Sequence, residues 1–389
     1  MKIKILFVGL NGATANTFVA GILATKAKKG TLNGCVTDLK EFSQLELPKL
    51  NDFSFGGWDI IKSSVIEAAT AHAILPQLII DAIPRESNID ALPGWKSKFD
   101  PPLLKEPNNL LPEMPLTEIV SQFEQDIKKA KHDADCDSCI VVLLGPPLRE
   151  FSEAMQSLLS VEDLEQAIAQ DRKNIVPSPL VYALAGIRQG CAILDFTANK
   201  TLEIRALVSL AERCKVPIAG RDGSTGQTYL KHGIATLLGM RGLAIKGWYS
   251  ANILGNQDGY VLNMPEFAVT KMQDKTAALN KHCGLGPDTH VVDISYYRPR
   301  GDNKESWDSI DFTGWFDLPM QLKLNWLGRD SILAGPLLLD LCRLLAYELK
   351  AGTSGIQSHL AFYFKCPLGR GIPYSPFEQI NLLKKRFNL

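Results

Sequence analysis

A short apolar run that ends at a glycine and continues into a helix is the feature that most constrains the fold of this chain. Residues 3–8 (IKILFV) are mostly apolar, Gly9 follows directly, and residues 14–29 have the spacing of an amphipathic helix. A strand, a tight turn and a helix in this order open a nucleotide-binding βαβ unit, in which the N–H groups at the helix start can hold a pyrophosphate. We therefore expect an α/β fold that begins with a dinucleotide site.

The glycine turn itself departs from the usual GxGxxG pattern, because Asn11 stands where the second glycine is expected. Taken alone, the turn is equally typical of a plain tight connection. Asp59, at the end of the next predicted strand (residues 53–60), is a candidate for the adenosine ribose, although it lies farther along than the usual spacing of about 20 residues. A solvated aspartate at a strand end fits it equally well.

Strands and helices alternate through the first 240 residues, which is typical of a Rossmann-type, doubly wound parallel sheet. After residue 240 the segments 243–254, 289–298 and 320–326 alternate polar and apolar residues around one helix (265–280), which indicates a sheet with one open face. We expect an NAD-binding domain at 1–240, a mixed α+β catalytic and tetramerisation domain inserted at 241–330, and a C-terminal segment at 331–389 that returns to the first domain. In that segment, residues 361–364 are predicted to form a buried strand that ends at Lys365.

The balance of charge excludes two classes of function. The chain has 42 basic and 42 acidic residues, whereas nucleic-acid and anionic-membrane surfaces need a basic excess. Charges and Pro336 interrupt the apolar stretch 331–349, and charges lie too close to the first apolar run for a secretory signal, so a cytoplasmic location is expected. Cys136 and Cys139 form an isolated CxxC, which is more typical of two ordinary thiols than of a zinc site.

Two polar loops and a set of lysines are the candidates for chemistry. Residues 220–228 (GRDGSTGQT) lie between a predicted strand and helix and concentrate groups that suit an anion cradle. Residues 250–259 (SANILGNQDG) supply the paired donors and acceptors that a polyol needs, although a cluster of Asx-turns would also explain one such loop. Lys271 and Lys275 lie one helical turn apart; each lysine alone is more typical of a solvated surface charge. Lys365 is the least ordinary of them, because a lysine at the end of a buried strand can be desolvated.

With these loops in order, the chain resembles the myo-inositol-1-phosphate synthases over nearly its whole length. The motifs that carry the resemblance are GLNGATANTFVAGIL, GGWDI, SVEDLEQAIAQDRKNIVPS, AGRDGSTGQT, SANILGNQDGY, FAVTKMQDK, RPRGDNK, RDSILAGPLLLDL and FKCPL. The departures are Asn11 and Ala13-Thr14 in the glycine turn, Gly145-Pro146-Pro147 after the third strand, and Gln257 in the second polar loop. These changes concern mostly how NAD is held.

The resemblance implies a role for each matching residue. The catalytic residues would be Lys271, Lys275, Lys304, Lys365, Asp222, Asp302 and Asp330. The cofactor-binding residues would be Gly9, Asn11, Gly12, Ala13, Thr14, Asp59, Gly145, Asp222, Asn252 and Asp258. The substrate-binding residues would be Ser224, Thr225, Gly226, Gln227, Thr228, Asn256, Gln257, Lys271 and Lys275. Some members use a divalent cation or an ammonium ion, for which Asp222 and Asp258 are the candidates.

The resemblance also implies the reaction. NAD would take a hydride from C5 of glucose 6-phosphate, the ring would close by an aldol step from C6 to C1, and the hydride would be returned, so that the enzyme is an intramolecular lyase in a homotetramer. Lysines suit this chemistry because an enolate, an alkoxide and a phosphate dianion share one pocket. A related cyclase acting on another sugar phosphate, an NAD-dependent sugar dehydrogenase and a non-catalytic NAD-binding homologue remain as alternatives.

Overall fold

The larger of two sheets is parallel throughout and carries the N-terminal half of the chain. The computed structural model describes residues 1–136 and 138–389, leaving out the side chains of Lys271, Gln273, Asp274, Lys275 and Ala278. The strand order is β11-β6-β5-β4-β1-β2-β3. Its strands are β1 (Ile3–Val8), β2 (Phe53–Asp59), β3 (Leu92–Pro93), β4 (Ser138–Leu143), β5 (Ala192–Asp195), β6 (Pro217–Gly220) and β11 (Gly355–Ile356). Because β1 lies between β2 and β4, the order reverses at the β1–β4 pair, where such sheets form their ligand crevice.

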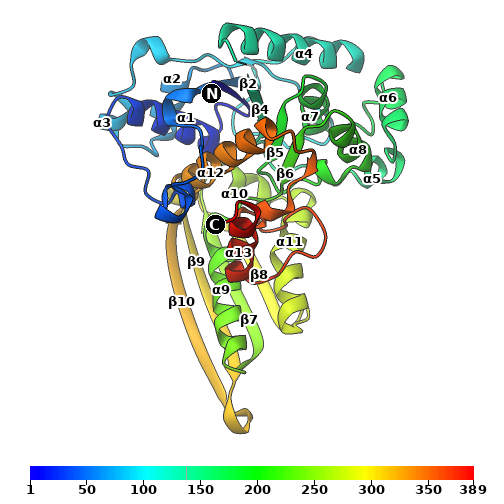
Figure 1. The fold of residues 1–389 in the computed structure, drawn as a ribbon. Helices are drawn as coiled ribbons and strands as arrows, with labels where there is room; N and C mark the ends of the chain where they lie inside the picture. Colours follow the sequence, from blue (N-terminus) through cyan, green and yellow to red (C-terminus); the bar gives the residue numbers. More distant parts are fainter. Residues whose placement is uncertain (137) are drawn as a thin grey trace.

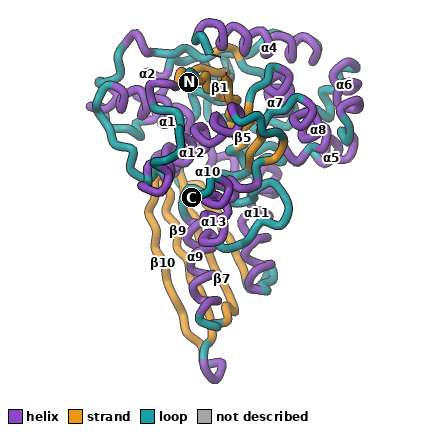
Figure 2. The backbone as a smooth tube through the Cα atoms, in the orientation of Figure 1, coloured by secondary structure: helices purple, strands orange, loops and turns teal. Residues whose placement is uncertain are grey.

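Helices cover both faces of this sheet, and the alternation of strand residues explains why (Figures 1 and 2). Ile3, Ile5 and Phe7 pack on one side and Leu6 on the other, because successive strand residues point to opposite faces. The first side is covered by α1 (Ala13–Lys26) and α12 (Asp330–Lys350), and the second by α4 (Leu116–Asp133), α6 (Val161–Ala169), α7 (Ser178–Arg188) and α8 (Arg205–Arg213). Shorter helices are α2 (Val65–His72), α3 (Gln77–Ile80) and α5 (Ser152–Ser157).

The smaller sheet is mixed and projects away from the larger one (Figure 1). Its order is β10-β9-β7-β8, with only the β7–β8 pair parallel. The strands are β7 (Ala244–Leu254), β8 (His290–Tyr296), β9 (Asn303–Thr313) and β10 (Pro319–Arg329). Helices α9 (Gln227–Met240) and α11 (Pro265–Cys283) pack on one face through Ala235, Trp248, Leu279 and Ile310, and the chain ends with α13 (Pro376–Arg386). Helix α10 (Gln257–Leu262) follows β7 directly.

The predicted fold class, a doubly wound sheet with a second mixed sheet inserted before the C-terminal segment, is confirmed. Ser160 forms a capping box at the start of α6, since Ser160 Oγ accepts from the Asp163 N–H and the Asp163 carboxylate accepts from the Ser160 N–H. The domain boundaries stay a prediction. Among the described helices, none combines the length and apolarity needed to span a bilayer.

The sequence prediction was wrong for the segment before Lys365. Residues Ser358–Tyr363 form a 3-10 helix instead of a strand, and only Phe364 makes an isolated antiparallel bridge, with Gly223. This apolar run packs against the large sheet as a 3-10 helix. Apolarity alone does not distinguish a buried strand from a buried helical turn. Strand β9, which carries Lys304 near its start, was not predicted from the sequence.

Candidate active site

Lys365 and Asp222 form a buried ion pair at the centre of the candidate site. Lys365 Nζ donates to Asp222 Oδ1 at 2.7 Å, and the Lys365 backbone N–H donates to the Asp222 carbonyl oxygen at 2.7 Å. The two side chains are 8% and 6% exposed. Residues 220–224, after β6, are therefore joined along their backbone to the segment that carries Lys365.

The loop after β6 is fixed on its other side by the loop after β5. The Asp222 and Gly223 N–H groups donate to the carbonyl oxygens of Thr197 and Phe196 at 2.7 and 3.2 Å. A Cβ atom at Gly223 would lie 2.1 Å from Phe196 Cζ, so this close contact requires glycine. The carboxylate of Asp222 is thus positioned by backbone contacts on both sides.

Lys304 reaches the same loop through Asp330. Lys304 Nζ donates to Asp330 Oδ2 at 3.2 Å, and Thr225 Oγ1 donates to Asp330 Oδ1 at 3.1 Å. Lys304 lies on β9, Asp330 begins α12, and Thr225 lies three residues beyond Asp222 in the loop. Three residues span at most about 10 Å, so two buried lysines from distant parts of the sequence meet one short loop.

Asp302 joins three elements beside Lys304. Its Oδ1 atom accepts from Ser331 Oγ at 2.8 Å and from Asn256 Nδ2 at 3.4 Å, and its Oδ2 atom accepts from the Ser331 N–H at 3.2 Å. Burial raises the pKa of Asp302, and the hydrogen bonds from Ser331 oppose that shift. Asp302 therefore fixes the start of α12 next to Asp330.

The predicted anion cradle lies at the start of α9. Gly226 is the N-cap and no side chain caps the helix, whose first turn is closed by the Leu230 N–H donating to the Gly226 carbonyl oxygen. The N–H groups before Leu230 in α9 are thus not used by the helix itself, and together with the positive end of the helix dipole they could hold an anion. The Ser224 N–H instead donates to Tyr363, and the Gln227 amide turns inward to Asp308.

The glycine turn after β1 has the geometry of a pyrophosphate site. Gly9 has φ +90°, and a Cβ atom there would lie 2.6 Å from the Leu144 carbonyl oxygen. Gly12 is the N-cap of α1, again without a capping side chain, so the N–H groups of Ala13 and Thr14 begin an uncapped helix. This turn and Gly145 lie at the β1–β4 switch point. The residues present therefore fit a dinucleotide there.

Asn11 and Asp59 shape this turn. The Asn11 N–H donates to Asp59 Oδ2 at 2.8 Å, and Asn11 Nδ2 donates to the carbonyl oxygens of Ile61 and Ser63, each at 3.0 Å. Asp59 Oδ1 accepts from the Ile61 N–H at 2.8 Å, and burial raises the pKa of Asp59. The Ile60 N–H is a third backbone donor to Asp59, and because a carboxylate has about four lone-pair sites, Asp59 could still accept from a ribose hydroxyl.

The predicted second polar loop, residues 250–259, is a loop only in part, because it spans the last residues of β7 and the first turn of α10. Asn252 is fully buried, and its Nδ2 atom donates to the Asp293 carbonyl oxygen at 3.3 Å. Asn256 is the N-cap of α10, and Gln257 Oε1 accepts from the Leu104 N–H at 2.9 Å, so this amide contacts the loop around residue 104. Asp258, half-buried, lies in the first turn of α10.

Two predicted lysines cannot be placed atom by atom. Lys271 and Lys275 lie on α11, and their side chains lie outside the described residues. Within the described part of the chain, no three His, Cys, Asp or Glu side chains form a group that could hold a metal ion, so the role of Asp222 and Asp258 toward a cation stays a prediction.

The sequence did not predict a buried charged cluster below the cradle, in which Lys231, His290 and Asp308 meet Ser250 of the predicted second polar loop. Lys231 Nζ lies 3.3 Å from His290 Nε2 and 3.7 Å from Asp308 Oδ1, and Ser250 Oγ donates to Asp308 Oδ1 at 2.5 Å. Burial lowers the pKa of Lys231 to about 8, although Asp308 opposes the shift. Lys304 and Asp308 are four residues apart on β9, so their side chains lie on the same face of the smaller sheet.

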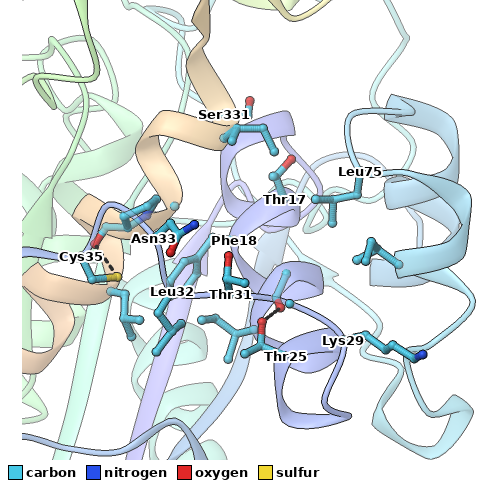
Figure 3. A pocket seen from close by; sticks show the side chains of 18 residues that line it. Thr17, Phe18, Thr25, Lys29, Thr31, Leu32, Asn33, Cys35, Leu75 and Ser331 are labelled. Carbon is cyan, nitrogen blue, oxygen red and sulfur yellow. Dashed lines mark hydrogen bonds between the residues drawn. The ribbon is translucent and has the colours of Figure 1, made fainter. Parts of the chain in front are cut away.

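A separate cavity of about 330 Å³ lies between α1 and α12 (Figure 3). Thr17, Phe18 and Thr25 of α1 line it, together with Ser331 and Pro336 of α12. It adjoins the site through Ser331, and its described lining includes none of the predicted site residues. It is therefore not part of the candidate active site.

Comparison with known sequences agrees with the resemblance. The family profile described as myo-inositol-1-phosphate synthase matches residues 3–387. Inositol-3-phosphate synthase 1 of Bacteroides thetaiotaomicron is 33% identical over 387 residues, which cover 94% of this chain and 90% of that protein. Inositol-3-phosphate synthase of Dictyostelium discoideum is 27% identical over 87% of this chain and 73% of that protein.

Two solved structures share the whole fold. Inositol-3-phosphate synthase from Caenorhabditis elegans superposes with a TM-score of 0.87 at 24% identity, covering 99% of this chain and 85% of that one. A myo-inositol-1-phosphate synthase-related protein from Thermotoga maritima gives a TM-score of 0.80 at 22% identity, covering 100% and 99%. Both sheets and the helices between them therefore occur in the same arrangement in other proteins.

Proposed function

Because this chain belongs to the myo-inositol-1-phosphate synthase family, we propose that it is an inositol-3-phosphate synthase that converts glucose 6-phosphate to myo-inositol 1-phosphate. The reaction is a redox-neutral intramolecular lyase reaction in inositol and phospholipid biosynthesis, and NAD is the cofactor. The observation that carries the proposal is the meeting of Lys365 and Lys304, both buried, at the loop 222–225. The alternatives of a related cyclase, a dehydrogenase and a non-catalytic homologue gain no support from this arrangement.

The cofactor site follows from the switch point. We assign Gly9, Gly12, Ala13, Thr14 and Gly145 to the pyrophosphate side, with Asn11 shaping the turn and Asp59 facing the adenosine ribose. Asp222, Asn252 and Asp258 would lie on the nicotinamide side. NAD, when bound, supplies reversible hydride transfer, and a divalent cation or ammonium ion near Asp222 and Asp258 is an additional hypothesis.

The lysines would handle the negative charge of the reacting sugar. We assign Lys271 and Lys365 to the C1 and C5 oxygens, where an ammonium group stabilises an alkoxide and can give up or accept its proton. Lys275 and Lys304 would hold the phosphate or assist proton transfer, with Asp222, Asp302 and Asp330 orienting lysines and hydroxyls. Burial strengthens each of these interactions because water screens them less.

The phosphate would lie against the start of α9. The N–H groups of Gly226, Gln227 and Thr228 belong to an uncapped helix start, and the hydroxyls of Ser224 and Thr225 flank it. Asn256 and Gln257 from the second polar loop complete the assigned substrate-binding residues. Lys304, which is buried and reaches Thr225 through Asp330, would attract the phosphate to this site.

We also infer that the protein is a cytoplasmic homotetramer that assembles through the smaller sheet. We propose that its domains are residues 1–240, 241–330 and 331–389. The face of that sheet opposite α9 and α11 exposes Tyr249, Val291, Trp307 and Leu327, each at least 41% accessible. Exposed aromatic and aliphatic side chains among polar ones on an open sheet face are typical of a subunit interface.

The test is product analysis with glucose 6-phosphate and NAD, in the presence of magnesium or ammonium ions. Wild type should form a cyclitol phosphate without net accumulation of NADH. Lys365→Ala should lower turnover by about 100-fold or more, the usual contribution of a positioned acid or base. Lys385→Ala, which changes an exposed lysine on α13, should retain full activity. Absence of cyclitol phosphate, or steady release of NADH, would contradict the proposal.

A further inference from the structure

Asp308 is a buried carboxylate that the proposed chemistry does not use. It lies on β9, 3% exposed, and faces α9. Its Oδ1 atom accepts from Ser250 Oγ at 2.5 Å and from Trp248 Nε1 at 2.8 Å, both on the neighbouring strand β7. Two donors on a rigid sheet therefore fix the position of this carboxylate, as a buried charge requires.

What Asp308 holds is the first residue of α9. Gln227 Nε2 donates to Asp308 Oδ2 at 3.0 Å and lies 3.2 Å from Oδ1. Gln227 is 5% exposed, so this residue is almost completely shielded from bulk solvent. The side chain of the residue that opens the uncapped helix is thus tied to the smaller sheet, while its backbone N–H remains at the helix start.

Lys231 makes a second attachment one turn farther along the same face of α9. Its Nζ atom lies 3.7 Å from Asp308 Oδ1, 3.3 Å from His290 Nε2 and 5.6 Å from the centre of the Trp248 ring. Burial lowers the pKa of His290 to about 4, so its ring is neutral. With Nδ1–H donating to Asn280 Oδ1 at 2.6 Å, Nε2 is left to accept from the Lys231 ammonium group.

Two attachments at positions i and i+4 fix both the rotation and the axial position of a helix, because these positions lie on one face. Helix α9 has no capping side chain to hold its start. A small rotation would turn its first N–H groups away from a phosphate, and hydrogen bonds weaken steeply when the angle at the hydrogen departs from linear. The cluster is therefore in the right place to set the alignment of the cradle.

We propose that Asp308 is a positioning residue for substrate phosphate: held by Ser250 and Trp248 and paired with Lys231, it fixes the start of α9 through Gln227. The inference rests on the proposed function for the identity of the substrate, and on the geometry of α9 for the alignment of the phosphate. Asp308 touches neither substrate nor cofactor in this scheme.

The experiment compares Asp308→Asn and Gln227→Met with wild type. Gln227→Met keeps the length of the side chain and the Asp308–Lys231 pair while removing the amide, so it tests the connection even if Asp308→Asn folds poorly. For both variants we expect KM for glucose 6-phosphate to rise by about tenfold, the loss of one hydrogen bond to a charged group, while kcat changes by less than about threefold. KM of the double variant should be no higher than KM of the more impaired single variant, because both changes break the same connection.

The readout that separates positioning from general stability is the affinity for inorganic phosphate, measured by titration calorimetry, beside the affinity for NADH. Phosphate affinity should fall by the same factor as KM rises, and NADH affinity should not change. Asp81→Asn is the matched control, because Asp81 accepts from Gln77 Nε2 at 2.8 Å at the exposed end of α3, and it should leave all values at wild-type levels.

Folded Gln227→Met with wild-type KM and wild-type phosphate affinity would overturn the inference, as would strictly additive effects in the double variant. Wild-type protein that binds phosphate but forms no cyclitol phosphate would refute the proposed function alone. The ratio of the phosphate affinity of each variant to that of wild type would still test the role of Asp308. Wild-type protein that binds no phosphate would overturn the positioning role.

Discussion

Lys365 Nζ and Asp222 Oδ1 lie 2.7 Å apart although 143 positions separate them in the chain, and both side chains are almost fully buried. A second pair, Lys2 and Asp135, has nearly the same separation, 2.6 Å, but lies on the surface with side chains 62% and 88% exposed. The two pairs have the same chemistry and differ in their contact with water, so they form a natural comparison.

Asp222→Asn should lower the free energy of unfolding by roughly 3–5 kcal/mol, because it leaves a buried ammonium group without its counter-charge. It should also abolish cyclitol phosphate formation, since Lys365 loses the group that orients it. Asp135→Asn should leave both stability and activity at wild-type values, because water solvates Lys2. Urea unfolding and product assays measure the two effects. Equal losses of stability in both variants would refute this account of the buried pair.

Gly9→Ala should weaken NAD binding and lower stability by roughly 1–3 kcal/mol. The residue has φ +90°, and the new Cβ atom would lie 2.6 Å from the Leu144 carbonyl oxygen. Gly21→Ala is the control on the same strand–helix unit: a Cβ atom there has no neighbour within 4 Å, so it should raise helix stability by about 0.5–1 kcal/mol. NADH fluorescence titration and urea unfolding test both. Tight NADH binding by Gly9→Ala would contradict the assigned pyrophosphate site.

The parallel sheet was predictable because its strands are buried on both faces and appear as short apolar runs such as 3–8 and 138–143. Strand β9 was not, because its buried face carries Lys304, Ser306 and Asp308, whereas Trp307 faces outward and is 52% exposed. The usual alternation is thereby reversed, and hydrophobicity gives no signal for it. Functional sites are where such local rules fail.

The candidate site was predictable as a set of residues but not as a set of contacts. Motifs identified Asp222, Lys304, Asp330 and Lys365, yet no spacing indicates that Lys304 reaches Thr225 through Asp330. Such pairings depend on how the smaller sheet lies against the loop after β6, which is a property of the folded chain. The same holds for the contact of Gln227 with Asp308, which turns inward an amide that the motif alone suggests for substrate.

Trp307→Glu should shift the protein to a smaller assembly. Trp307 lies opposite Ala251 on β7 and Asn325 on β10, in the middle of the exposed face of the smaller sheet. A carboxylate buried there without a partner would cost several kcal/mol in each interface. Leu78→Glu, which changes a leucine 71% exposed on α3, controls for the added charge and should not alter the assembly. Light scattering coupled to size-exclusion chromatography gives the mass; an unchanged tetramer in Trp307→Glu would exclude this interface.

The free energy of unfolding of Asp195→Asn should increase relative to that of wild type as pH rises. Asp195 is fully buried at the end of β5, and burial raises its pKa to about 7, against hydrogen bonds from Thr197 that lower it. Because the folded pKa lies above the unfolded value of 3.8, the folded state binds the extra proton between these two values. The contribution of Asp195 to stability is therefore complete below pH 3.8 and lost as pH rises through about 7. Asparagine does not titrate, so the variant should gain roughly 3 kcal/mol over wild type between pH 5 and pH 8.

Urea unfolding of both proteins at these two pH values measures the difference. Thr197→Val provides the complementary change, because it keeps the shape of the side chain and removes the hydroxyl that donates to Asp195 Oδ1 at 2.6 Å. Without that donor the pKa of Asp195 should rise further, so Thr197→Val should lose more stability than wild type as pH rises from 5 to 8. A difference between Asp195→Asn and wild type that stays constant with pH would show that this buried carboxyl is already ionised at pH 5, which its burial makes costly.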